Sequence, residues 1–505
     1  MMNTSVRVLL CVLALVGPAR GVAQSQEADA LGAQSAAGAA AMEAQRFDEA
    51  ASIYEGLVTA RPADAGLLMN LGMARYMAGH AEHAIAPLQK AVKLNPTLAP
   101  AALFLGASLL DVGRFKDAAA PLHDAVAAMP KNAEAREMLA RATLALSDYP
   151  SAATHYRALT TLDAASPKAW FGLARSYQGI AEDAFAALQQ QAPESPMLEL
   201  IVAEVAVTAG KFPAALSIYR RVLAAGPPVG GVHEAVAELY ERAGKPEWAA
   251  AELKRSPPRT PAACASKQAE CLFLDGKFRE ALRAARASKS PVGLYWTIRA
   301  ANSLATESVA RLETLPPSVE LHLIRAEIAQ AQGRRADAVT AVRAALALAP
   351  GDAAIEVALG EALVRANDLG EALPLLERLA REHPQDTSIL FMLGDALLLS
   401  QRIDEAIPVL ERAVTANPGA LAPRASLGRA YVQAGRFEAA LPHLEAAAVE
   451  DEDGDVHYQL ARAYQALQRM DQAKLAMTEY QKRQAQQAPA EPAGGETEAT
   501  LTPPQ

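Results

Sequence analysis

The chain has 505 residues and a formal net charge of −9, and 51% of its residues are hydrophobic while only 5% are aromatic. Acidic residues (57) outnumber basic ones (48), and no long basic run occurs, which argues against a nucleic acid partner. With so few aromatic residues, leucine and small side chains must fill the core, and this composition suits closely stacked helices.

Residues 1–23 have the pattern of a cleavable signal peptide. Arg7 precedes an apolar run at 8–17, and Gly21 and Ala23 are small residues at the expected cleavage site. The run is shorter than the roughly 20 residues that a spanning helix needs. We therefore expect an exported chain, periplasmic or secreted, that does not span the membrane once the signal is cleaved. A cytosolic chain with an apolar first helix is the alternative.

One motif recurs with a period of 34 residues. It is clearest at 353–454, where the same position holds Gly360, Gly394 and Gly428. Each copy has a Leu-Gly or Leu-Ala pair, a short turn, an Ala near the start of a second apolar segment and often a closing Pro. Apolar spacings of three and four residues place these side chains on one face of a helix. Such a period predicts a solenoid in which each unit buries its apolar face against its neighbours.

The motif can be followed along the chain to residue 482 in about 14 units. Residues 24–166 hold regular N-terminal units, 167–318 hold irregular units, and 319–482 hold regular C-terminal units. Two units in the middle, 167–195 and 291–318, are shortened at the turn, so we expect altered curvature or a break there. Residues 483–505 have no apolar periodicity and are predicted to be a disordered tail.

Two cysteines remain after removal of the signal segment, Cys264 and Cys271. A single helix over this stretch places them roughly 10 Å apart along its axis. A disulfide tolerates a Cα separation of at most about 7 Å. The sequence therefore predicts two buried free thiols.

These units resemble tetratricopeptide repeats in the Leu-Gly pair, the Ala of the second helix and the closing Pro. The resemblance covers most of the chain after the signal segment. It implies an all-α fold, a right-handed superhelical solenoid of about 14 helix-turn-helix repeats. It also implies that the first helix of each unit lines a concave groove that binds protein or peptide partners.

We expect the partner-binding residues on these first helices. In the N-terminal units they are mainly apolar and predict a groove for a peptide or helix, with packing between units as the alternative: Met69, Met73, Tyr76, Leu103 and Leu110. Farther along they are charged and predict an acidic stripe beside a basic one, with ordinary solvated surface as the alternative: Arg141, Arg175, Glu361, Asp395, Arg429 and Arg462.

The sequence offers little for catalysis. It has no nucleophile elbow, zinc-protease motif or phosphate loop. His80 and His83 have a spacing that could bind a metal weakly, but no further ligand is apparent. We therefore predict no catalytic residue, no metal, no cofactor and no enzymatic activity.

The resemblance suggests a non-enzymatic scaffold or adaptor that mediates protein–protein interactions in the bacterial cell envelope, in assembly, secretion or polysaccharide export. The alternative is a helical solenoid that binds carbohydrate or peptidoglycan. A saccharide site requires exposed aromatic side chains, and the tryptophans available for it are Trp170, Trp248 and Trp296.

Overall fold

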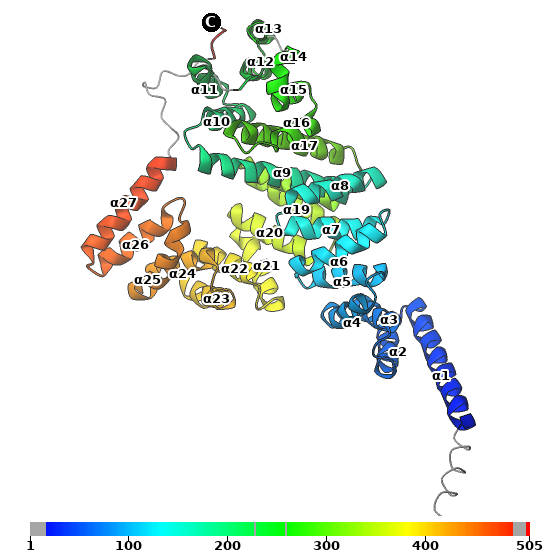
Figure 1. Ribbon diagram of the computed structural model, residues 1–505. Coiled ribbons are helices and arrows are strands. Elements are labelled where there is room, and N and C mark those ends of the chain that lie inside the picture. Colours follow the sequence, from blue (N-terminus) through cyan, green and yellow to red (C-terminus); the bar gives the residue numbers. More distant parts are fainter. Residues whose placement is uncertain (1–16, 227–228, 258–259, 488–500, 505) are drawn as a thin grey trace, which may run out of the picture. The chain divides into compact units, whose positions relative to one another are not determined.

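The computed structural model describes residues 17–226, 229–257, 260–487 and 501–504. Within these ranges the regular elements are 27 α-helices and one short 3-10 helix, without a strand (Figure 1). The predicted all-α fold, a solenoid of helix-turn-helix units, is confirmed.

Helices follow one another in pairs along the chain. The first group is α1 (Gly17–Glu43), α2 (Phe47–Ala60), α3 (Ala65–Met77), α4 (Ala81–Leu94), α5 (Ala99–Asp111), α6 (Phe115–Ala128), α7 (Ala133–Ala145), α8 (Tyr149–Leu162) and α9 (Pro167–Gln191). The middle group is α10 (Pro196–Thr208), α11 (Phe212–Ala225), α12 (Val232–Arg242), α13 (Pro246–Leu253), α14 (Pro261–Ser266), α15 (Gln268–Leu274), α16 (Phe278–Ala285) and α17 (Pro291–Glu313). The last group is α18 (Val319–Ala331), α19 (Arg335–Leu348), α20 (Ala353–Arg365), α21 (Leu369–Glu382), α22 (Thr387–Leu399), α23 (Ile403–Ala416), α24 (Leu421–Gln433), α25 (Phe437–Ala447), η1 (Ala448–Glu450), α26 (Asp455–Ala466) and α27 (Met470–Gln487).

The recurring glycine of the motif lies where the two helices of a unit are closest. A Cβ atom added at Gly394 would lie 2.4 Å from Cδ2 of Leu410, and one at Gly72 would lie 2.3 Å from Cγ of Leu88. Distances this short mean that a larger residue would force the two helices apart. Leu88 and Leu410 are fully buried. The 34-residue glycine period is thus a period of helix–helix contacts.

The turn between the two helices of a unit passes through one residue with a left-handed backbone. That residue is glycine at Gly79 and Gly435, but it is Ser147, Asn367 or Gln401 in other units. Glycine adopts this conformation without a steric cost, whereas other residues are strained there. The turn geometry is therefore kept even where the favoured residue is missing.

The two shortened units each form one continuous helix. Residues 167–191 build α9 and residues 291–313 build α17, with no turn inside either. The prediction of a shortened helix-turn-helix unit is wrong at these two places. The missing residues are those of the turn, so the first and second helices have become one.

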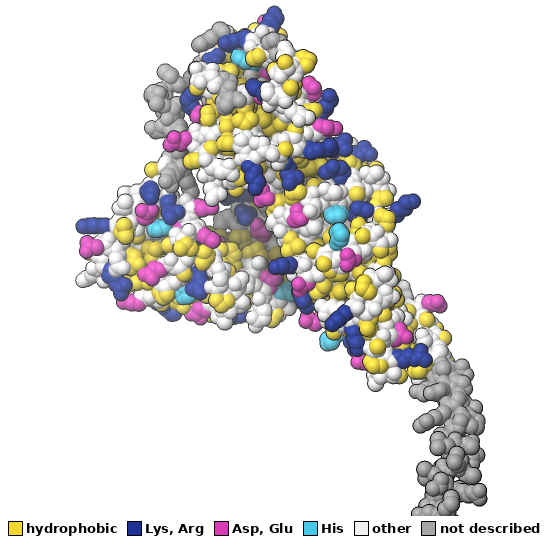
Figure 2. Space-filling view, in the orientation of Figure 1, with side chains coloured by type: hydrophobic (Ala, Val, Ile, Leu, Met, Phe, Trp, Pro, Cys, Tyr) yellow, Lys and Arg dark blue, Asp and Glu magenta, His cyan; other side chains and the backbone are white. Residues whose placement is uncertain are grey.

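The helices fall into two compact units. The first comprises residues up to Leu198 together with 259–312, and the second comprises 199–258 together with residues from Glu313 onward. A buried cluster over α3–α7 forms part of the core of the first, and one over α18–α24 part of the core of the second. On the face seen in Figure 2, acidic and basic side chains are interspersed with hydrophobic ones over the helices.

The two ends of the chain lie partly outside the described residues. Of the predicted signal peptide, residues 1–16 lie outside them and residues 17–23 begin α1. Of the predicted disordered tail, residues 483–487 belong to α27, and residues 501–504 are placed against helices of the second unit. Among the described helices, none combines the length and apolarity needed to span a membrane.

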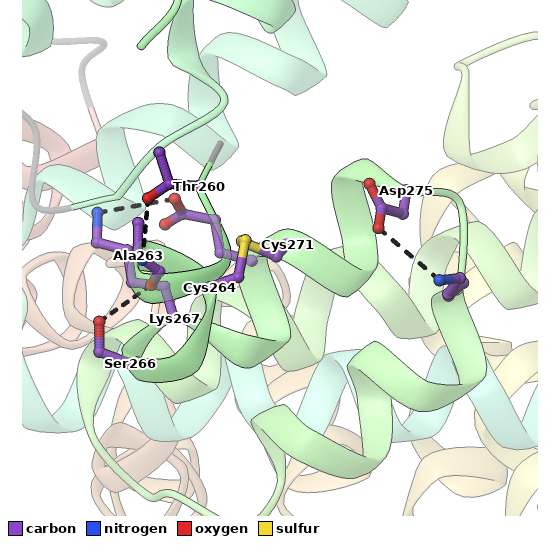
Figure 3. The surroundings of a disulfide bond; sticks show 9 residues. Thr260, Ala263, Cys264, Ser266, Lys267, Cys271 and Asp275 are labelled. Atoms are coloured by element: carbon purple, nitrogen blue, oxygen red, sulfur yellow. Dashed lines mark hydrogen bonds and ion pairs between the residues drawn. A yellow bond between two sulfur atoms is a disulfide. The ribbon is translucent and has the colours of Figure 1, made fainter. Parts of the chain in front are cut away.

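Cys264 and Cys271 form a disulfide bond (Figure 3), so the prediction of two free thiols is wrong. The assumed single helix is broken at Lys267, whose backbone angles (φ −123°, ψ 44°) separate α14 from α15. Thr260 caps α14 by accepting a hydrogen bond from the backbone N–H of Ala263. The break brings the two Cα atoms to 5.6 Å, within the range of a disulfide.

Candidate partner-binding site

A cavity of about 680 Å³ lies on the first helices of the last three repeat units. Its walls are α22, α24 and α26, together with the segment that joins α25 to α26. The lining residues that matter here are apolar on one side and charged on the other: Phe391, Leu421, Val456, Asp395, Ser426, Arg429, Glu450, Asp451, Glu452, Asp453 and Asp455. First helices were the predicted location of partner-binding residues.

Asp395 and Arg429 form an ion pair in this cavity. Their side chains are 27% and 35% exposed, so the pair is neither fully solvated nor sealed from water. The hydroxyl of Ser426 donates a second hydrogen bond to Asp395 Oδ1, at 2.9 Å. This network fixes the orientation of the Asp395 carboxylate on the cavity wall.

An acidic segment, residues 450–455, forms one edge of the cavity. Its member Asp451 is buried and holds the start of α26, because its carboxylate accepts hydrogen bonds from the backbone N–H groups of Val456 (3.1 Å) and His457 (2.9 Å). Burial by itself would raise the pKa of Asp451, but hydrogen bonds from the side chain and backbone of His457 and from Val456 hold that pKa below its ordinary value. Asp451 is therefore a structural carboxylate.

The other acidic residues of this segment, Glu450, Glu452, Asp453 and Asp455, are exposed. Burial raises the pKa of Asp455, and the nearby carboxylates of Asp453 and Asp451 raise it further, while Arg429 partly offsets this effect. Only the contribution of Asp453 and Asp451, which is secondary to that of burial, reflects the negative charge gathered at this edge. Because Arg429 is already paired with Asp395, this edge favours a cationic group of a ligand.

Of the five predicted apolar residues, two are buried in the packed core and three are half-buried. Leu103 and Leu110 belong to the buried cluster over α3–α7, and Met69 and Tyr76 are half-buried against it. Tyr76 meets Phe104 edge to face, with 5.6 Å between the ring centroids. Met73 is also half-buried. Leu103 and Leu110 thus contribute to packing between helices, and a partner-binding role for the five residues stays a prediction.

The six predicted charged residues do not all come together. Arg141, Arg175 and Arg462 are exposed on different helices, α7, α9 and α26. Glu361 pairs with Arg365 on its own helix, at 3.0 Å. Of the two predicted stripes, the structure joins Asp395 to Arg429, the residues one repeat apart on α22 and α24.

Sequence reasoning missed the acidic segment and its apolar counterpart, Phe391. The signal was present, because the run Glu450-Asp451-Glu452-Asp453-Gly454-Asp455 is the densest acidic stretch of the chain. It interrupts the 34-residue motif where the closing proline would stand. The acidic run, where the sequence departs from the repeat pattern, thus indicates the position of the cavity.

The histidines considered as metal ligands and the tryptophans considered for saccharide binding make other contacts in the structure. His80 lies 3.1 Å from Asp48, measured from Nε2 to Oδ1, and the described residues contain no group of three or more His, Cys, Asp or Glu suited to a metal. Trp296 is fully buried. Trp170 is half-buried and donates a hydrogen bond to the carbonyl of Ala164, at 2.9 Å, and Trp248 is half-buried with its ring edge-on to Tyr240.

Stacked helical hairpins define a class, the helical repeat proteins. The particular family follows from comparison. Profiles described as tetratricopeptide repeat match residues 35–99, 105–167, 137–196, 203–263, 357–420, 426–489 and 397–453. These ranges span more than half of the chain, and the chain belongs to the tetratricopeptide repeat family.

Solved structures of repeat proteins are similar to parts of the chain. TTC0263, a thermophilic protein of this family from Thermus thermophilus, is 20% identical over 34% of this chain and 93% of its own, with a TM-score of 0.30. MamA from Desulfovibrio magneticus RS-1 is 19% identical over 34% of this chain and 97% of its own, with a TM-score of 0.30. Another MamA structure is 23% identical over 30% and 81% of the two chains, with a TM-score of 0.28. A search of the curated proteins found no match.

Proposed function

We propose that this chain is a non-enzymatic scaffold or adaptor that binds a partner protein in the cavity on α22, α24 and α26. Tetratricopeptide repeat proteins bind protein partners, which is the general function that the family supports. The main support for this binding site is the cavity itself, which has an apolar wall and an acidic edge. We propose a basic segment of the partner as the bound element.

The chemistry of the cavity supports this choice of ligand. A lysine or arginine side chain has an apolar stem and a cationic head. The stem can pack against Phe391, Leu421 and Val456, while the head meets the exposed carboxylates of residues 450–455. Complementary charge of this kind mainly sets specificity and the association rate. Binding should therefore weaken as the salt concentration rises.

We further propose that the chain is exported to the cell envelope and acts there in assembly, secretion or polysaccharide export. The signal-like segment at 1–23 supports export. The disulfide between Cys264 and Cys271 supports it independently, because disulfides persist in oxidising compartments and are rare in the cytosol. Cell fractionation with mass spectrometry tests this, and a cytosolic chain that keeps residues 1–23 would contradict it.

The binding proposal is tested by capture of partners from an envelope extract on the immobilised chain. The test variant carries Glu450→Gln, Glu452→Gln and Asp453→Asn, which neutralise three of the four exposed carboxylates of this edge and leave the structural Asp451 in place. A matched control neutralises exposed acidic residues on second helices: Asp404→Asn, Glu438→Gln and Asp471→Asn.

We expect the wild type and the control to retain the same proteins, and the test variant to retain at least about tenfold less, because each tenfold loss costs only about 1.4 kcal/mol. Equal retention by all three chains would exclude the cavity as the binding site. Binding of purified glycans, with no protein retained by any chain, would instead support the saccharide alternative.

A further inference from the structure

The C-terminal segment of the chain, residues 501–504, lies against α11 and α12 of the second unit. Figure 1 shows the C-terminal end beside these two helices. Its contacts involve two side chains, Arg220 of α11 and Tyr240 of α12. Leu501, Thr502 and Pro504 are half-buried there.

Arg220 binds the segment through three hydrogen bonds. Its Nη1 donates to the hydroxyl oxygen of Thr502 at 2.5 Å, and its Nη2 donates to the carbonyls of Thr502 (3.1 Å) and Pro503 (2.7 Å). Within the described residues, the Arg220 guanidinium has no carboxylate partner. The neighbouring Arg221 differs, because it forms an ion pair with Glu199 at 2.7 Å. The polar partners of Arg220 are thus the segment itself and the Tyr240 hydroxyl.

Tyr240 provides the second anchor. Its side chain is fully buried, and its hydroxyl donates a hydrogen bond to the Thr502 carbonyl at 2.8 Å. Its ring packs edge to face on Trp248 of α13, with 5.6 Å between the centroids. A buried tyrosine hydroxyl needs a partner, and its contact with Arg220 is longer, at 3.4 Å. The Thr502 carbonyl therefore completes this site.

The prolines of residues 501–504 favour binding to such a site. Thr502 precedes Pro503, which disfavours a helical backbone at Thr502, and the two prolines fix their own φ angles. A chain restricted in this way loses less conformational entropy on binding. Its prolines offer carbonyl oxygens but no backbone N–H, which matches a site that supplies only donors.

We propose that α11 and α12 form a binding site for an extended, proline-containing peptide, and that the chain's own residues 501–504 occupy it in the isolated protein. Covalent attachment presents this segment at an effective concentration on the order of 1 mM for short linkers. A partner with a similar Thr-Pro-Pro segment must compete with it. The site is thus self-occupied until such a partner displaces the tail, and it does not depend on the function proposed for the cavity on α22, α24 and α26.

The test uses the full chain and a variant that ends at residue 500, with the peptide ATLTPPQ, labelled at its amino end, as the probe. Fluorescence anisotropy measures peptide binding to both chains. We expect the shortened chain to bind the peptide at least tenfold more tightly than the full chain, because the site is vacant. In the shortened chain, Arg220→Gln and Tyr240→Phe should each weaken binding at least fivefold, while Arg221→Gln should leave it unchanged.

Circular dichroism confirms that each variant is folded before binding is measured. Equal binding by the shortened and full chains, or no loss on Arg220→Gln, would overturn the proposal, as would no binding to the shortened chain at millimolar peptide. Sedimentation of the full chain tests the same segment in another role. A dimer that becomes a monomer on removal of 501–505 would show that a second copy supplies the segment, and would exclude occupation within one chain.

Discussion

At the scale of the residue, Asp451 shows how one side chain can serve structure within a site that looks built for a ligand. It lies in the densest acidic run of the chain, yet it is buried and accepts hydrogen bonds from two backbone N–H groups at the start of α26. The ring Nδ1 of His457 also contacts its carboxylate. Its neighbours Glu450, Glu452 and Asp453 are exposed, and the partner-binding role proposed above falls to them.

Replacement of Asp451 by alanine should destabilise the folded chain in a pH-dependent way. We expect a loss of about 1–2 kcal/mol at pH 7, as for other lost helix caps. The pKa of Asp451 is lower in the folded chain than its ordinary value of 3.8. Its contribution is therefore complete above about pH 4 and disappears as the pH falls through the folded-state pKa. Urea unfolding of wild type and Asp451→Ala at pH 7 and pH 3 measures this, and a difference that grows on acidification would contradict it.

At the scale of the element, the two helices of a unit pack closely because the first helix has a glycine, which has no side chain, at the point of contact. Gly394 lies against the buried Leu410, and the same contact recurs one repeat on, between Gly428 and Leu444. A glycine inside a helix costs about 1 kcal/mol relative to alanine. The repeat accepts this cost because it allows the leucine to fill the space next to the backbone of the first helix.

Whether Gly394→Ala stabilises or destabilises the folded chain should therefore depend on the side chain of Leu410. In the wild type, the added Cβ would lie 2.4 Å from Leu410 Cδ2, and we expect net destabilisation because overpacking of a core costs about 1–3 kcal/mol. In a Leu410→Ala background the space is free, and the same substitution should stabilise by about 1 kcal/mol. Thermal unfolding of the four chains of this double-mutant cycle measures the coupling.

Gly56 provides the control for this cycle. It lies within α2, and an added Cβ there meets nothing within 4 Å. Gly56→Ala should stabilise the wild-type chain. Additive effects of Gly394→Ala and Leu410→Ala would show that the two side-chain positions are independent.

At the scale of the whole molecule, the short helices α14 and α15 are joined by the one disulfide found in the described residues. α14 has six residues and no buried side chain, so packing contributes little to its stability. Isolated helices of this length are unstable in water. The covalent bond therefore replaces the stabilisation that a buried helical face provides elsewhere in the array.

Loss of the disulfide should destabilise this segment more than the rest of the chain. Cys264→Ser with Cys271→Ser removes the constraint on a short loop, for which we expect a loss of about 2–3 kcal/mol. Hydrogen exchange should accelerate mainly at 260–274, because repeat arrays open locally. A reductant should have the same effect on the wild type and none on the double variant, and unchanged exchange at 260–274 would contradict the prediction.

The repeat fold could be predicted from the sequence because the 34-residue period reflects helix–helix packing. Glycine recurs at the packing position, as at Gly360, Gly394 and Gly428. The disulfide between Cys264 and Cys271 could not be predicted from the sequence, because no hydrophobic period reveals the helix break at Lys267. The pairing of Asp395 with Arg429 follows from residues one repeat apart on adjacent first helices. The docked residues 501–504 could not be predicted, because a segment of threonine and proline has no periodicity and its contacts lie more than 250 positions away in the sequence.

The left-handed turn residues act as phase marks along the chain. They advance by 34 positions from Gly113 to Ser147 and again from Gly210 to Gly244, but by 63 from Ser147 to Gly210, because α9 contains no turn. Two full periods would be 68, so the units at Gly210 and Gly244 are out of step with the first units by five residues. A periodicity search with a fixed step therefore loses register at α9, then between Gly244 and Gly276, which lie 32 positions apart, and again at α17. Register must be reset at each of these three places when equivalent residues are compared between the two ends of the array.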